Sequence, residues 1–240
     1  MRAALVIGCI AFCFLGSSGV HAASLRVAPT NLTLLAPESV ATLNLRNEDT
    51  RPINVQIRVL RWSQVDGTER LEPTTDVVAS PPLTTLGAHG DYLVRVVRMS
   101  KAPVVGEESY RLLVDELPDP ARRRPGAVNF VLRYSIPVFF ASPDTSPPQV
   151  SWTLQPNGKG AVLIATNIGG RHLRIADLKI NDAGRTLTAR TGLVGYVLGG
   201  ATMSWLLPHS GSSISGHSVA LSAEGDAGAI DATVTVQSGR

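Results

Sequence analysis

In the segment GAVNFVLRYSIPVFF, residues 126–140, every second residue from 128 to 138 is apolar, and most residues between them are polar or proline. In an extended strand, a period of two places all the apolar side chains on one face. That face consists of Val128, Phe130, Leu132, Tyr134, Ile136 and Val138. The opposite face includes Pro137, which has no backbone N–H and therefore fits only an edge strand, a strand end or a bulge. The pattern predicts a long strand that partly borders solvent or a partner.

Strand-like segments of the same kind recur along the chain, and no long amphipathic helix is predicted. The first set comprises LRVAPTNLTLL, VATLNLRN, INVQIRVLRWSQ, DYLVRVVRMS and SYRLLVDELP. The second set comprises VSWTLQP, GAVLIATN, LRIADLKIN, GYVLGG, SSISGHSVALSAE and AIDATVTVQ. Turn sequences such as NED, DG and PP separate the segments. Short strands at this spacing indicate an all-β protein built from β-sandwiches.

The run SPDTSPPQ, residues 142–149, separates the two sets and contains three prolines. Proline stiffens the backbone and does not fit a central strand, so this run is predicted to be a linker. We therefore expect a first sandwich domain over residues 24–141, a linker over residues 142–148 and a second sandwich domain over residues 149–240. A cleft is expected between the two domains.

Residues 1–23 are predicted to form a cleaved signal peptide. A basic residue, Arg2, precedes an apolar run over residues 3–15, and small residues follow. The apolar run is too short for a membrane span, which favours secretion over anchoring. Both cysteines, Cys9 and Cys13, lie in this segment. The mature chain is therefore expected to have no disulfide, no thiolate nucleophile and no cysteine metal site.

The charge pattern does not indicate nucleic-acid binding. The formal net charge is +3, and the basic residues are scattered apart from a triplet at residues 122–124. Such a triplet without interleaved aromatic residues is typical of a solvated loop.

The sequence also gives no coherent enzyme signature. GHSVA, residues 216–220, differs by one residue from a G-x-S-x-G nucleophile elbow, but no histidine follows Ser218. The mature histidines lack the close spacing expected of ligands on a metal-binding helix, and no phosphate loop or dinucleotide fingerprint is present. We therefore expect no enzymatic activity, no cofactor and no metal.

Four groups of residues resemble the periplasmic pilus-assembly chaperones of the chaperone-usher pathway, the PapD-like family, and especially its divergent, archaic branch associated with spore-coat-U-type pilins. They are RNEDTRPINVQIRVLRWSQVDG, VVASPPLTTLGAHGDYLVRVVR, YRLLVDELPDP with VNFVLRYSIPVFF, and GYVLGGATMSW. The resemblance covers essentially the whole mature chain and rests on the order and spacing of these groups. It implies two immunoglobulin-like β-sandwiches arranged as an L, a periplasmic location, and two partners, which are pilin subunits and an outer-membrane usher.

The resemblance also implies a function for the alternating strand. A pilin is an immunoglobulin-like fold that lacks its last strand, and chaperones of this family lend one of their own, which is donor-strand complementation. The donor strand is therefore expected at about residues 127–140, with the subunit bound by Val128, Phe130, Leu132, Tyr134 and Ile136. Alternation alone also fits an ordinary strand whose apolar face packs on the chain's own core.

In the better-known branch of the family, an arginine in the first strand and a lysine in the last strand of the first domain bind the terminal carboxylate of the pilin. The matching positions here hold Asn31 and Pro137, and neither residue carries a positive charge. A desolvated carboxylate needs a cationic partner. The leading substitute is Arg111 in the segment YRLLV, and Arg98 and Arg133 are further candidates.

Arg95, Glu116 and Asp226 match the interdomain charge cluster of the family, which is expected to fix the angle between the domains. The expected geometry is an ion pair between Arg95 and Glu116, with Asp226 close by across the cleft. The turn Ser80-Pro81-Pro82 resembles a family turn that contains a cis proline.

A second interpretation is a structural module, either an immunoglobulin-like adhesin or a pilus component. A pilin would be expected to carry an N-terminal donor extension and often a disulfide, and the predicted mature chain has neither. The sequence therefore favours the chaperone over the structural module.

Overall fold

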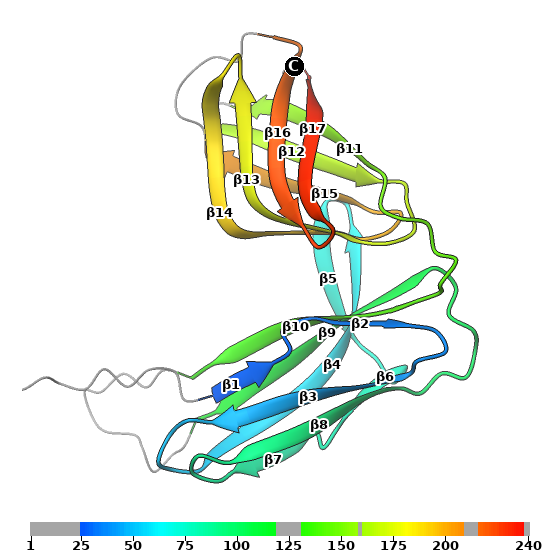
Figure 1. Ribbon diagram of the computed structural model, residues 1–240, viewed down its shortest axis with the longest axis vertical. Helices are drawn as coiled ribbons and strands as arrows, with labels where there is room; N and C mark the ends of the chain where they lie inside the picture. Colours follow the sequence, from blue (N-terminus) through cyan, green and yellow to red (C-terminus); the bar gives the residue numbers. More distant parts are fainter. Residues whose placement is uncertain (1–24, 119–130, 158–159, 209–215, 238–240) are drawn as a thin grey trace, which may run out of the picture.

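The computed structural model describes residues 25–118, 131–157, 160–208 and 216–237. Within these residues all regular secondary structure is β-strand, and no helix is long and apolar enough to cross a membrane. The strands form two bodies, β1–β10 and β11–β17, which lie as the two arms of an L (Figure 1). The predicted fold class, two immunoglobulin-like β-sandwich domains arranged as an L, is confirmed.

The first domain packs two sheets face to face. One sheet has the strand order β1-β3-β8-β6, and the other has the order β2-β10-β9-β4-β5, with β7 also paired to β4. The strands of the first sheet are β1 (Leu25–Ala28), β3 (Val40–Asn47), β6 (Val77–Ser80) and β8 (Asp91–Arg98). Those of the second are β2 (Leu32–Leu35), β4 (Ile53–Val65), β5 (Thr68–Pro73), β7 (Leu83–Leu86), β9 (Glu107–Leu117) and β10 (Arg133–Ala141).

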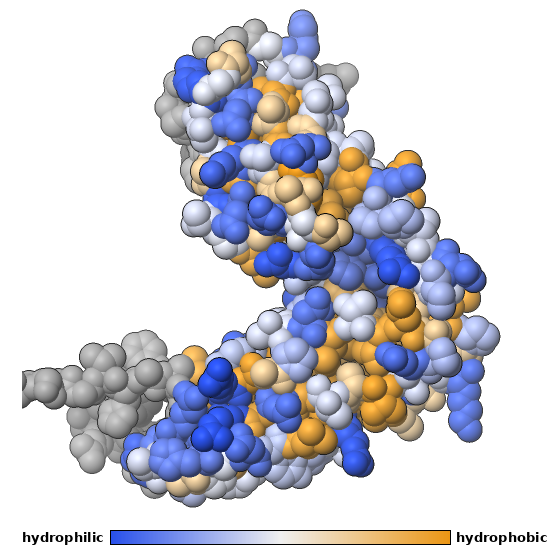
Figure 2. Space-filling view, viewed as in Figure 1, coloured by the Kyte–Doolittle hydropathy of each residue, from blue (hydrophilic) through white to orange (hydrophobic). Residues whose placement is uncertain are grey.

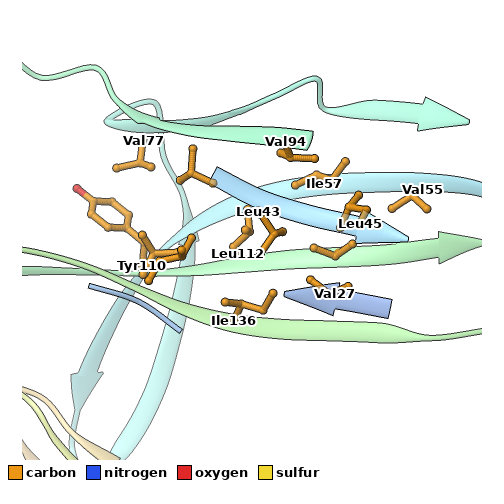
Figure 3. Packing of buried hydrophobic residues seen from close by; sticks show 14 of the residues in the cluster. Val27, Leu43, Leu45, Val55, Ile57, Val77, Val94, Tyr110, Leu112 and Ile136 are labelled. Atoms are coloured by element: carbon orange, nitrogen blue, oxygen red, sulfur yellow. The ribbon is translucent and has the colours of Figure 1, made fainter. Parts of the chain in front are cut away.

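Alternating burial along these strands forms one core between the two sheets (Figure 3). Strands β3 and β8 turn every second side chain inward, and Leu43, Leu45 and Val94 are fully buried there. The opposite sheet contributes Val55, Ile57, Tyr110, Leu112 and Ile136. Burying each large aliphatic side chain contributes roughly 1.5–3 kcal/mol. The period-two patterns of the sequence therefore account for the sandwich.

The first described segment joins the two sheets. Strand β1 pairs antiparallel with β3 in one sheet, whereas β2 pairs parallel with β10 in the other. Between them the chain crosses from sheet to sheet within residues 29–31. Strand β2 therefore lies beside the C-terminal part of β10.

The peptide bond between Ser80 and Pro81 is cis. This is the state that the resemblance of the turn Ser80-Pro81-Pro82 implies.

The second domain is a seven-stranded sheet with the order β14-β13-β16-β17-β11-β12-β15, and its two end strands contact each other. Its strands are β11 (Val150–Asn157), β12 (Gly160–Asn167), β13 (Leu173–Asp182), β14 (Arg185–Val197), β15 (Thr202–Pro208), β16 (Ser218–Gly225) and β17 (Gly228–Val236). The sheet encloses a second core that includes Trp152, Leu163, Ile180, Leu221 and Val234.

The connection between the domains is packed onto the second domain. The side-chain oxygen of the buried Asn167 accepts hydrogen bonds from the N–H groups of Gln149 and Gly169, at 3.0 and 2.9 Å. A Cβ atom on Gly169 would lie 2.1 Å from the carbonyl oxygen of Pro147, so only glycine fits at that position. Residues 142–149, which join β10 to β11, therefore form a fixed corner.

Candidate functional site

Strand β10 has an open edge for half of its length. It pairs with β9 from Arg133 to Ala141, whereas β2 covers its other edge only from Val138 to Ala141. Within the described residues, the edge from Arg133 to Pro137 has no strand beside it. Pro137 occupies the last position before β2 begins to pair, as expected of a proline at an edge. An open edge of this kind is a template for another strand.

The apolar face of β10 has different contacts at its two ends. Ile136 and Val138 are 2% and 0% exposed and belong to the core of the first domain. Leu132 and Tyr134 are only half-buried against that core, and the Tyr134 hydroxyl donates a hydrogen bond to the Leu25 carbonyl oxygen at 2.6 Å. The Ile136 side chain fills the space between the chain's own sheets, so any part of Ile136 in subunit binding stays a prediction for its backbone on the open edge.

Two other predicted subunit-binding residues, Val128 and Phe130, lie outside the described residues, so their role stays a prediction. Leu132 and Tyr134 lie at the exposed end of the same face. The core-facing interpretation of the alternating pattern is therefore correct for its C-terminal half.

A pocket of about 480 Å³ lies in the cleft beside the open edge. Its first-domain wall consists of Thr30, Asn31, Arg111 and residues 134–137, and its second-domain wall consists of Arg174, Leu193, Tyr196 and Asp226. Figure 2 shows the hollow between the two lobes, which opens to solvent. The pocket brings together Asn31, Pro137 and Arg111, the three positions that the sequence connected with a carboxylate.

Arg111 is 8% exposed, yet its guanidinium lines this pocket. Its Cζ atom lies 3.7 Å from the ring centroid of Trp62 and 5.2 Å from that of Tyr196. Its Nη2 donates a hydrogen bond to Glu69 Oε1 at 3.4 Å. Burial lowers the pKa of Arg111 from the usual arginine range, and Glu69 opposes this effect. Since arginine keeps its charge in proteins, the residue is a fixed cation in the pocket wall.

Arg98 lies outside this pocket, within the first domain. Its Nε and Nη2 donate to the two carboxylate oxygens of Glu108 at 2.8 and 2.7 Å, and its Nη1 donates to the carbonyl oxygens of Ser100 and Ala102. The hydrogen bonds that Arg98 donates to Glu108 raise the pKa of Arg98 against the effect of burial. The role of Arg98 as a carboxylate anchor stays a prediction, and its hydrogen bonds to Glu108, Ser100 and Ala102 make it the weaker candidate beside Arg111.

Arg133 lies on the cleft-facing side of the sheet, toward the other end of β10. Its Nε donates to Asp115 Oδ1, and Arg58 Nη2 donates to Asp115 Oδ2 at 2.7 Å. Burial raises the pKa of Asp115, but its bonds to the two guanidinium groups outweigh this and leave that pKa below its usual value. These residues line a second pocket of about 350 Å³. Any role of Arg133 as an anchor stays a prediction, because it does not line the pocket of Arg111.

Apolar and backbone contacts join the two domains next to the pocket of Arg111. Trp62, Phe139, Tyr196 and Leu198 form one buried cluster. Gln64 donates its side-chain N–H to the Tyr196 carbonyl oxygen at 2.9 Å and accepts from the Leu198 N–H at 2.8 Å. The β4–β5 hairpin reaches β15, where the Ser204 N–H donates to the Gly67 carbonyl oxygen at 3.3 Å (Figure 1).

A charged cluster lies at the same corner. The His172 ring stacks on Phe139 with 3.6 Å between ring centroids, and its Nδ1 lies 2.9 Å from Glu107 Oε1 of the first domain. The His172 Nε2 lies 3.5 Å from Asp226 Oδ2, and Arg174 Nε lies 3.8 Å from Asp226 Oδ1. Among the described residues, no group of three or more His, Cys, Asp or Glu side chains is placed to hold a metal ion.

The predicted interdomain cluster is wrong in two of its three members. Arg95 lies on β8 in one sheet of the first domain, and Glu116 lies on β9 in the other sheet. No ion pair joins these two residues in the part of the chain that the structure describes, because the sheets separate them. Asp226 does face the cleft, but its partners are His172 and Arg174.

Sequence reasoning missed Glu107, His172 and Arg174. No motif marks them, because they are distant in sequence and meet only where the two domains pack.

A family profile described as pili and flagellar-assembly chaperone, PapD N-terminal domain, matches residues 24–146. No curated protein sequence matches the chain.

Solved structures share the fold. A chain of the CsuC–CsuE chaperone–tip adhesion subunit pre-assembly complex, from archaic chaperone-usher Csu pili of Acinetobacter baumannii, is 23% identical with a TM-score of 0.69, covering 90% of this chain and 100% of that chain. The E. coli chaperone DraB is 21% identical with a TM-score of 0.59, covering 88% and 97%. A chain of the Salmonella enterica complex of the SafA pilin with the SafB chaperone is 20% identical with a TM-score of 0.60, covering 88% and 94%. At these identities the likeness establishes the fold.

Proposed function

Since the profile match spans residues 24–146 of 240, the chain belongs to the family of pili and flagellar-assembly chaperones, and we propose that it captures pilin subunits in the periplasm by donor-strand complementation and passes them to an outer-membrane usher. The observation that carries the proposal is the open edge of β10 beside a cationic pocket. Strand addition to such an edge satisfies the backbone of both partners.

The pocket also indicates the direction of the bound strand. Strand β2 runs parallel to β10 and occupies the same edge from Val138 onward. A subunit strand on the open part of that edge would lie end to end with β2, so one end of the subunit chain would reach the pocket beside Asn31. The guanidinium groups of Arg111 and Arg174 in the pocket wall attract a carboxylate and repel a terminal amine. We therefore expect the C-terminal strand of the subunit to bind parallel to β10.

The apolar face at the open end would supply the affinity. Leu132 is half-buried and directly precedes β10, which begins at Arg133. Complete burial of such a side chain in a subunit groove would contribute roughly 1.5–3 kcal/mol, and the predicted donor residue Phe130 would add a similar amount.

The first prediction tests capture through the paired change Phe130→Asp and Leu132→Asp. Each aspartate would lose its hydration in an apolar groove without gaining a partner, so the variant should not form an equimolar complex with a pilin subunit co-expressed in the periplasm. Its thermal melt should stay cooperative, because Leu132 is only half-buried in the free protein. Co-purification and protection of the pilin from proteolysis measure the effect.

Leu93→Asp is a matched control for this prediction. Leu93 is 47% exposed on β8, in the sheet that does not contain β10, and its replacement should leave capture intact. An unchanged yield of pilin with the double variant would show that the subunit docks elsewhere. Unfolding of the double variant would show that the two side chains belong to the core.

A further inference from the structure

Leu193 on β14 is an apolar side chain that the second domain turns toward the cleft. It is 56% exposed, and it lines the same pocket as Ser135 and Pro137 of β10. Single exposed leucines are common on protein surfaces, so exposure alone indicates no function. The orientation of Leu193 is informative, however, because the backbone departs from a regular strand on both sides of it.

A register shift reverses the direction in which Leu193 points. Val197 is fully buried in the core of the second domain, and regular alternation from it would place Leu193 on the same inward face. Between its pairs with Ile175 and Ala176, however, β14 advances by two residues while β13 advances by one. The extra residue, Val194, packs against the core instead. A bulge of this kind turns the next side chain to the other face of the sheet.

A second register shift holds the backbone on the other side of Leu193. It lies between Ala176 and Leu178, where Asp177 and Gly192 have φ values of 49° and 75°, in the left-handed region. The Gly192 N–H donates a hydrogen bond to Asp177 Oδ1 at 2.8 Å. Glycine and aspartate are residues that adopt this region readily. The outward direction of Leu193 is therefore built into the strand pairing.

The open edge of β10 indicates what would cover Leu193. Ser135 and Pro137 alternate with the core-facing residues of β10 and line the pocket in the cleft. In a parallel pair, opposite side chains point to the same face, as Leu32 and Val138 do in the core of the first domain. A strand bound on the open edge would therefore direct its side chains opposite Ser135 and Pro137 into the pocket that Leu193 lines.

We propose that Leu193 is a specificity-determining residue, which forms with Pro137 an apolar subsite for a cleft-facing side chain near the C-terminal end of the bound strand. This inference rests on the proposed function. It adds a preference on the face of the bound strand that points into the cleft. The ligand class is an extended peptide with an aliphatic residue at that position. An aliphatic side chain there removes the apolar surface of Leu193 from water, and a small polar one leaves it hydrated.

The test uses two synthetic peptides of about ten residues, long enough for one strand. Both alternate valine and threonine, end in a threonine with a free carboxylate and carry an N-terminal fluorophore. In the second peptide, leucine replaces the threonine at the third position from the C-terminus, which faces the cleft when the valines face the core. The wild-type protein should bind the leucine peptide about 3- to 10-fold more tightly, measured by fluorescence anisotropy.

Leu193→Ser should reduce this preference to less than about twofold, because it removes the apolar wall of the subsite. It should leave binding of the threonine peptide unchanged. Leu206→Ser is the matched control, since Leu206 is 57% exposed on β15 of the same domain and lies outside the pocket. This control should keep the full preference for the leucine peptide.

A second pair of variants tests whether the bulge positions Leu193. Asp177→Ala removes the acceptor of the Gly192 N–H and places alanine at a positive φ, so the preference should fall. Asp177→Asn keeps an oxygen acceptor and a side chain that tolerates this backbone, so the preference should be retained. Both variants should bind the threonine peptide as the wild type does. An equal preference in both variants would overturn the positioning role of Asp177.

The remaining outcomes separate this inference from the proposed function. An undiminished preference in Leu193→Ser would overturn the subsite, and weaker binding of the threonine peptide by that variant would show a structural role instead. Equal binding of both peptides by the wild type would overturn the subsite but agree with capture at the edge strand. If the wild type bound neither peptide, capture at the edge and the inference that rests on it would both be overturned.

Discussion

At the scale of single residues, the arginines of this chain differ in whether their guanidinium groups are already bonded inside a domain. Arg98 donates hydrogen bonds to Glu108 and to two carbonyl oxygens, and its side chain is 6% exposed. Arg111 is buried to a similar extent, but among the described residues it donates only one hydrogen bond, and it lines the pocket. The number of remaining N–H groups, rather than exposure, therefore distinguishes a structural arginine from a candidate anchor.

The ion pair of Arg98 and Glu108 predicts a loss of stability in acid. The hydrogen bonds from Arg98, opposed by burial, hold the pKa of Glu108 below its ordinary value of 4.5. A lowered pKa in the folded state means that the stabilisation is present above pH 4.5 and disappears as the pH falls through the folded-state pKa. Glu108→Gln should reduce the free energy of unfolding by about 1.5–3 kcal/mol at neutral pH. In acid the difference between wild type and variant should shrink.

Urea unfolding at neutral and acidic pH measures both quantities for this pair. Because Asp115 also has a lowered pKa, the wild type should lose some stability in acid even without Glu108, so only the difference between the two proteins is informative. A difference that did not change with pH would contradict an ionised, paired Glu108.

At the scale of the element, the two halves of β10 have different surroundings, although their apolar side chains lie on the same face. Its C-terminal half packs on the core of the first domain from Ile136 onward and lies between β9 and β2 from Val138 onward. Its N-terminal half has an open edge and a half-buried face. The change occurs at Pro137, where pairing with β2 is about to begin.

This division predicts opposite effects for two alanine substitutions on the same face. Ile136→Ala removes a side chain that is 2% exposed and should lower the free energy of unfolding by about 2–5 kcal/mol. Leu132→Ala should lower it by about 1 kcal/mol or less but should weaken capture of a co-expressed pilin. Denaturant unfolding and co-purification measure the two effects. Equal losses of stability in both variants would show that the face is core along its whole length.

The same strand shows what the sequence can and cannot predict. Period-two alternation identified the strand and its apolar face, and Pro137 identified the edge. Alternation could not locate the boundary at Ile136, because a side chain that enters the chain's own core and one that enters a partner follow the same period. The family resemblance suggested Arg111, which lines the cleft pocket, but it also suggested Arg98, whose partner Glu108 becomes visible only when β8 and β9 are folded.

At the scale of the whole molecule, the two arms of the L are held by side chains that no sequence pattern relates. Glu107 and His172 come from different domains, as do Gln64 and Tyr196. Their pairing depends on the angle at which the sandwiches meet. The expected cluster of Arg95 and Glu116 was wrong for this reason, since matching positions in a family does not determine which side chains a particular corner brings together.

These contacts predict that the angle is set by a small number of groups. The double change Gln64→Ala and His172→Ala removes two hydrogen bonds between the Gln64 side chain and the backbone of the second domain. It also removes the imidazole ring stacked on Phe139 and its contact with Glu107. Small-angle scattering should then show a broader distribution of interatomic distances, while each domain stays folded. His217→Ala, an exposed residue just before β16, is the control and should leave the scattering unchanged. A profile identical to that of the wild type would mean that the packed linker, the buried cluster around Trp62 and the contact of Gly67 with Ser204 fix the angle without Gln64 and His172.

The end-to-end position of β2 has a consequence for the genes of potential partners. A bound strand that runs parallel to β10 would meet the first residues of β2, so its pairing with β10 would end at that point. The reading frame of a partner is therefore expected to end directly after the codons of an alternating strand, without any trailing segment. An affinity tag fused downstream of that last codon should prevent assembly, whereas the same tag placed upstream should be harmless.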